Sequence, residues 1–124
     1  MRATAVLVLS FLSAPMALAC SCFPPASRAE SAPLALQNAK FAIHARVTSI
    51  NQGGQATLLV IESFKGPSAN SSIEITPREH QCGKVSFSVG EEALLTSFGN
   101  AVTYCDKYAP EPFLLDAFRK AAAK

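Results

Sequence analysis

Four cysteines constrain this chain more than any other feature, because two of them stand almost together and far from the others. Cys20 and Cys22 are separated by a single residue, whereas Cys82 and Cys105 follow much later. An even number of cysteines in a small exported domain is typical of disulfides. A bridge between Cys20 and Cys22 would close a strained ring, so each is expected to pair with one of the two distant cysteines. The sequence therefore predicts two disulfides that tie the start of the domain to its body.

The residues before Cys20 have the three parts of a secretory signal peptide. A charged tip precedes a short apolar run over residues 3–12, and the small residue Ala19 stands at the cleavage position. The apolar run is too short to span a bilayer as a stable helix. We therefore predict a signal peptide over residues 1–19 and one secreted or periplasmic domain over residues 20–124, which begins with Cys20.

Charge and aromatic content argue against several classes of partner. One of the eleven Lys and Arg residues, Arg2, lies in the predicted signal peptide, so the mature domain carries ten against nine Asp and Glu. This balance gives no electrostatic footprint for nucleic acid or anionic lipid. With two Tyr and no Trp, the chain also lacks the aromatic residues of a base-stacking platform. We expect a monomer that binds no nucleic acid, and no membrane unless Cys20 is lipidated.

No residue pattern predicts catalysis. The sequence has no Ser-His-Asp, Cys-His or glycine-rich phosphate-binding arrangement, so we expect no enzyme activity and no cofactor. His44 is expected to face solvent rather than to bind a metal. The adjacent Glu91 and Glu92 are expected in a solvated turn, since neighbouring side chains point apart. A zinc site built from the cysteines would need paired C-x2-C spacings, which are absent.

Alternation of apolar and polar residues predicts a mainly β domain. Phe41, Ile43, Ala45 and Val47 alternate with other residues, and this pattern places one apolar face inward. The tight-turn residues Asn51–Gly54 join this stretch to the next as a hairpin. The predicted strands cover residues 40–50, 55–64, 72–76, 85–89, 93–97 and 101–104.

Two short helices are predicted at the two ends of the domain. Ser27–Glu30 fits a capping box before a helix over residues 32–39, with Pro33 tolerated in its first turn. Glu111–Phe113 opens a final helix. Its apolar stripe is formed by Phe113, Leu114, Leu115 and Phe118. Five or so strands, two helices and the disulfides together predict a small closed or partly open barrel.

Several segments, taken in order, resemble one protein family. The segments are "CSCFPP", "FAIHARV", "VIESFKGP", "CGKVSFSVG" and "TYCD". They are similar to the inhibitory N-terminal domain of the tissue inhibitors of metalloproteinases, within the netrin-like group, and to a short bacterial-type member of it. The resemblance implies a five-stranded Greek-key barrel of the OB-fold class. It also implies the disulfides Cys20–Cys82 and Cys22–Cys105.

The same resemblance implies a metalloendopeptidase inhibitor that acts through its N-terminus. A catalytic zinc keeps one coordination position open, and the α-amino nitrogen and carbonyl oxygen of Cys20 would chelate the target's zinc there. An α-amino group has a pKa of about 8, so the metal displaces its proton at small cost. Ser21 would enter the S1′ pocket of the protease. The flanking contacts would come from Cys22, Phe23, Pro24, Glu79, His80 and Gln81.

Departures from the family pattern keep other functions open. We expect neither the third disulfide nor the second domain of the vertebrate inhibitors, and the turn at Asn51–Gly54 is short. One alternative is a netrin-like binding module whose disulfides are purely structural, for which an oligosaccharide is one possible ligand. Another is a lipoprotein acylated at Cys20, although Ala17 stands where such signals favour Leu and three thiols would be left.

Overall fold

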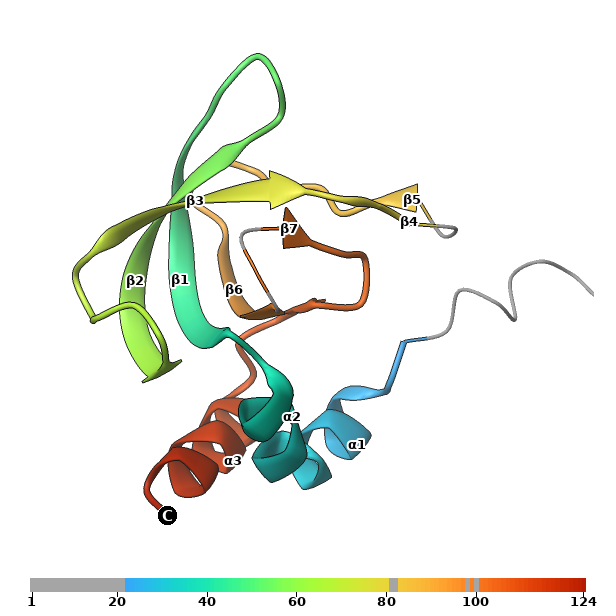
Figure 1. Cartoon of the computed structure of the whole chain (residues 1–124), viewed down its shortest axis with the longest axis vertical. Coiled ribbons are helices and arrows are strands. Elements are labelled where there is room, and N and C mark those ends of the chain that lie inside the picture. Colours follow the sequence, from blue (N-terminus) through green and yellow to red (C-terminus); the bar gives the residue numbers. More distant parts are fainter. Residues whose placement is uncertain (1–21, 81–82, 98, 100) are drawn as a thin grey trace, which may run out of the picture.

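The computed structural model describes residues 22–80, 83–97, 99 and 101–124 (Figure 1). In this part of the chain a strongly curved β-sheet packs on a layer of three short helices. The helices are α1 (Pro25–Glu30), α2 (Ala32–Asn38) and α3 (Pro112–Ala122). The strands are β1 (Phe41–Ile50), β2 (Ala56–Lys65), β3 (Ser72–Pro77), β4 (Glu79–His80), β5 (Gly83–Lys84), β6 (Glu92–Ser97), β7 (Ala101–Val102) and β8 (Lys107–Tyr108).

Six of the described strands form one sheet that curls into a nearly closed barrel. Their order is β7-β3-β2-β1-β6-β8, in which β3 and β7 run parallel and all other neighbours run antiparallel. Strand β7, at one edge of the sheet, also contacts β6 near the other edge, and this contact nearly closes the barrel. The buried hydroxyl of Ser97, the last residue of β6, lies against the carbonyl oxygens of Gly99 and Ala101. The mainly β, barrel-like prediction is therefore confirmed.

The alternation predicted for β1 explains how the sheet separates two cores. Phe41, Ile43, Ala45 and Val47 are buried inside the barrel, as their spacing predicts. Ala42 points to the opposite face and is buried under the helices. His44 lies on that outer face too, and only 12% of its side chain is exposed, because its ring bonds to a carboxylate of β6. The prediction that His44 faces solvent was wrong.

Proline placement gives the described part of the chain three helices, where two were predicted. The first helix begins at Pro25, so Ser27 lies within α1 and the predicted capping box is absent. Proline suits the first helical position because its missing N–H has no partner there. The ring of Pro33 is incompatible with a helix continuing from the preceding turn, since it would clash with the carbonyl of Ala29. The chain bends at Ser31, and α2 starts afresh with Pro33 in its first turn.

The final helix closes the outer core. Leu114, Leu115 and Phe118 of α3 are buried, and the ring of Phe118 lies 5.6 Å from that of Phe64 on β2. Phe113, which was predicted as part of the same stripe, is 49% exposed, because it lies outside the face that contacts the sheet. Arg119 of α3 also donates through Nε to the carboxylate of Glu62 on β2 at 2.8 Å, which joins the helix to the sheet.

The sequence between β3 and α3 differs most from prediction. Residues 85–89 alternate like a strand but form none, because no described strand pairs with them; Lys107 instead donates to the carbonyl of Ser86 and lies over the ring of Phe87. The expected polar loop before Cys82 contains β4, which pairs with β5 after that cysteine, and β8 was not predicted. The predicted strand over residues 101–104 is shorter, ending at Val102.

Candidate functional site

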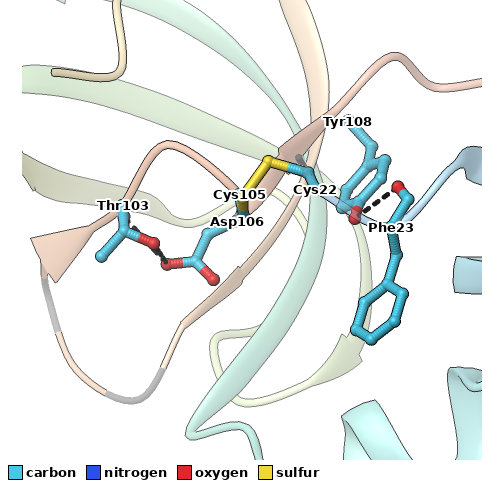
Figure 2. Close-up of a disulfide and its surroundings, with 6 residues drawn as sticks. All are labelled: Cys22, Phe23, Thr103, Cys105, Asp106 and Tyr108. Atoms are coloured by element: carbon cyan, nitrogen blue, oxygen red, sulfur yellow. Dashed lines mark hydrogen bonds between the residues drawn. A yellow bond between two sulfur atoms is a disulfide. The ribbon is translucent and has the colours of Figure 1, made fainter. Parts of the chain in front are cut away.

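A disulfide joins Cys22, the first described residue, to the turn between β7 and β8. Cys22 and Cys105 are bonded, with their Cα atoms 5.3 Å apart and a sequence separation of 83. Cys22 precedes α1, and Cys105 lies in the turn between β7 and β8, so the bond links the segment before the helices to a turn late in the chain (Figure 2). This pairing, implied by the family resemblance, is confirmed.

The turn that carries Cys105 is shaped by one carboxylate. Asp106 Oδ2 accepts hydrogen bonds from both the backbone N–H and the hydroxyl of Thr103, each at 2.8 Å. The backbone N–H of Asp106 donates to the Thr103 carbonyl at 3.1 Å, which closes the turn. The segment "TYCD" therefore has a structural role: it presents Cys105 to Cys22 and leaves the Tyr104 side chain 43% exposed.

A second tether acts on the residue after Cys22. The Tyr108 hydroxyl donates to the carbonyl oxygen of Phe23 at 3.1 Å. Tyr108 is buried, and this burial raises the pKa of its phenol. The ring of Phe23 points away from the disulfide and is 65% exposed (Figure 2). The chain start is thus fixed at two consecutive residues while a large apolar side chain remains available for contact.

The residues around the disulfide make an exposed edge, here called the Cys22 edge and consisting of Cys22, Phe23, Pro24, Tyr104 and Cys105. A hollow of about 350 Å³ is lined by four of them, all except Tyr104. A neighbouring hollow of about 400 Å³ includes Cys22 and Tyr104. Exposed aromatic rings beside a rigid, disulfide-bonded backbone are typical of surfaces that bind other proteins.

The second hollow also places the β4–β5 hairpin next to the Cys22 edge. Lys84 of β5 lines it together with Cys22. Glu79, at the start of the hairpin, is exposed, and His80 pairs with Gly83 across it. Four predicted site residues, Cys20, Ser21, Gln81 and Cys82, lie outside the described residues. The disulfide Cys20–Cys82 therefore stays a prediction.

The "FKG" segment quoted for the resemblance holds the fold together. Lys65 Nζ donates to the carbonyl of Leu36 at 2.7 Å, where the last turn of α2 leaves backbone acceptors without intrahelical partners. Gly66 has a φ of +93°, and a Cβ there would come within 2.8 Å of the Cβ of Phe41. With Phe64 packed on α3, this segment fixes the sheet to the helices.

The two glutamates expected in a solvated turn each form an ion pair. Glu91 receives Lys107 Nζ at 2.8 Å. Glu92 contacts Arg46 at 3.3 Å and His44 at 2.9 Å, and these hydrogen bonds, that of Arg46 first, lower the pKa of its carboxyl. Glu92 is the first residue of β6 and Glu91 directly precedes it, and their side chains point apart because neighbouring residues face opposite sides of an extended chain. Their contacts are structural.

Two functional candidates escaped sequence reasoning. Tyr104 lies in the segment "TYCD", but the sequence predicted no role for it. Its aromatic ring next to a cysteine is the signal that could have identified it. Tyr108 could not be found, because its role depends on a carbonyl 85 residues away in sequence. Across residues 22–80, 83–97, 99 and 101–124, no three His, Cys, Asp or Glu side chains gather as a metal site. None of the helices in this part of the chain is long and apolar enough to cross a membrane.

Comparisons with known proteins give no relative for this chain. No family model matches it, and no curated protein or solved structure shows significant similarity.

Proposed function

We propose that this protein is a secreted inhibitor of zinc metalloendopeptidases, built on an OB-fold barrel. An OB-fold is a five-stranded, partly open Greek-key barrel. Strands β1, β2, β3, β6 and β7 are the five that would form it. The pairings between non-consecutive strands, β1 with β6 and β3 with β7, are the ones that curl the sheet toward closure. The half-exposed disulfide is consistent with an extracellular location.

The observation that carries the proposal is the double tether of the chain start. Cys22 is bonded to Cys105, and the carbonyl of Phe23 is held by Tyr108. The proposed N-terminus, Cys20, lies only two residues earlier, so little of the chain remains to be ordered when it binds. A preorganised group loses less conformational entropy on association, which favours affinity.

The free amine and carbonyl of Cys20 would occupy the open position on the protease's zinc. The metal belongs to the partner, and the inhibitor supplies ligand atoms only. Ser21 would enter the S1′ pocket, and the Cys22 edge would pack against the surrounding cleft. Glu79, His80 and Gln81 of the adjacent hairpin would add flanking contacts.

One added residue tests this mechanism. A mature chain extended by a single Ala before Cys20 should inhibit a zinc endopeptidase at least about tenfold more weakly than the native chain, because a peptide bond replaces the free amine. Its Tm should stay unchanged, because no core contact is altered. A chain with one Ala added after Lys124 is the matched control and should inhibit fully.

Two results would contradict the proposal. Equal potency of the N-terminally extended and native chains would exclude chelation by the Cys20 amine. Absence of inhibition by the native chain across zinc endopeptidases of different S1′ pocket size would favour a netrin-like binding module. A lipoprotein would instead be recognised by an intact mass that is increased by acyl chains.

A further inference from the structure

A separate pocket of about 300 Å³ lies between the first two helices and the sheet. This volume is at the lower end of the range for small-molecule sites. Its lining includes the side chains of Phe23, Arg28, Leu34, Ala35, Thr96 and Tyr108. Most of the surface of this wall is apolar, and among the described residues Arg28 is its one cation. The carboxylate of Asp106 also lines the pocket, and its Oδ2 already accepts two hydrogen bonds from Thr103.

Arg28 has no anionic partner among the residues that the structure describes. Its Nη2 donates to the neutral hydroxyl of Thr96 at 2.6 Å, and its guanidinium lies 5.4 Å from the centre of the Tyr108 ring. Among the described residues no carboxylate comes within ion-pair distance of it, and its buried Nε meets no acceptor there. The positions outside the description include no Asp or Glu.

Comparison with other cations shows that a partly buried cation without a carboxylate partner is unusual in this protein. Lys107, the other partly buried cation of the described residues, is paired with Glu91. Arg46 and Arg119 are exposed and still pair with carboxylates. A partly buried charge loses hydration, and proteins normally compensate this loss with a counter-ion. Arg28 is left with a hydroxyl and an aromatic face.

We propose that this pocket binds an organic carboxylate with an apolar body. The carboxylate would pair with Arg28, whose planar guanidinium matches carboxylate geometry. The body would contact Leu34, which is 59% exposed at the rim, and the neighbouring Ala35. The carboxylate belongs either to a free small acid or to the C-terminus of a peptide. This inference does not rest on the proposed inhibitory function, although Phe23 contributes to both surfaces.

Titration of ¹⁵N-labelled mature protein tests the proposal with matched probes. 3-Phenylpropionate should shift the backbone amide signals of Leu34, Ala35 and Thr96 saturably, with a Kd of about 1 mM or tighter. Its neutral analogue, 3-phenylpropionamide, should bind at least about tenfold more weakly. The peptide N-acetyl-Ala-Phe and its C-terminal amide form the second pair. Saturable binding of the free acid alone assigns a small-molecule site, and stronger binding of the peptide acid assigns a peptide C-terminus.

Two variants locate the binding. Arg28→Gln should abolish the shifts caused by both acids, and Lys120→Gln, which removes an exposed cation of α3, should leave them intact. Unchanged binding to Arg28→Gln would overturn the proposal. So would equal binding of acid and amide by the native protein, a comparison that holds even if Arg28→Gln does not fold. If neither 3-phenylpropionate nor N-acetyl-Ala-Phe saturates up to about 20 mM, the proposal is overturned as well.

Discussion

At the scale of single residues, the chain start is held by contacts that no local pattern encodes. The Tyr108 hydroxyl donates a hydrogen bond to the carbonyl oxygen of Phe23, which lies 85 residues earlier in the sequence. Gly66 allows the end of β2 to pass against the backbone of Phe41. Both residues control where flanking segments lie, the first for the Cys22 edge and the second for the junction of sheet and helices.

Loss of the Tyr108 hydroxyl should loosen the chain start. Tyr108→Phe is expected to lower the free energy of unfolding by about 1 kcal/mol at neutral pH, the usual contribution of one hydrogen bond. Tyr104→Phe, in an exposed ring, is the matched control and should be neutral. Urea unfolding of both variants measures the difference. Equal stability of the two variants would show that the bond to Phe23 contributes nothing.

The same phenol should make stability depend on alkaline pH. Burial raises the pKa of Tyr108 in the folded protein, so the unfolded chain loses this proton first. The contribution is fully present below the unfolded pKa of about 10 and is lost as pH rises through the folded value. Stability of Tyr108→Phe should therefore fall less steeply above about pH 10 than that of Tyr104→Phe.

Gly66→Ala should destabilise the protein through two separable effects. The positive φ alone costs a non-glycine residue about 1 to 2 kcal/mol. The 2.8 Å approach of the new Cβ to Phe41 adds overlap with a buried side chain. Gly90→Ala is the control, because Gly90 has a similar φ of +88° and open space around it. Thermal unfolding should place Gly66→Ala below Gly90→Ala, and equal Tm values would exclude the overlap.

At the scale of elements, strands with an apolar face inside the barrel could be predicted, and pairings that depend on distant partners could not. Period-two alternation predicted β1 because burial of every second side chain is a local property. The same alternation wrongly predicted a strand over residues 85–89. No described strand pairs with this segment, and Lys107 donates to its backbone at Ser86. β8 is only two residues long and leaves no pattern to recognise.

The β1–β6 pairing carries a contact that should weaken in acid. Hydrogen bonds from Arg46 and then His44 lower the pKa of Glu92 below its usual 4.5. A depressed folded pKa stabilises the protein above the unfolded pKa, and this contribution is lost as pH falls through the folded value. Between neutral pH and strongly acidic pH, Glu92→Gln should lose less stability than the native protein does. Glu74→Gln, at an exposed position on β3, should behave like the native protein, and identical acid profiles for Glu92→Gln and Glu74→Gln would contradict this assignment.

At the scale of the whole molecule, a disulfide between residues 83 positions apart joins the segment before α1 to the turn between β7 and β8. In the chain-entropy model, closing a loop of this length stabilises the folded state by about 4 to 5 kcal/mol. The cysteine spacing predicted that the chain start is tied down, because Cys20 and Cys22 cannot easily pair with each other. The tether from Tyr108, the shape of the Cys22 edge and the position of Arg28 beside it arise only from the folded arrangement.

Inhibition by zinc chelation requires above all a mature chain that begins with a disulfide-bonded Cys20 whose amine is free. The intact mass of the exported protein, measured before and after reduction, tests this directly. We expect a mass that starts at unmodified Cys20 and rises by about 4 Da on reduction, one hydrogen for each sulfur of two disulfides. A mass increased by acyl chains, or a chain that starts elsewhere, would contradict the account, because no free Cys20 amine would then be available to bind zinc.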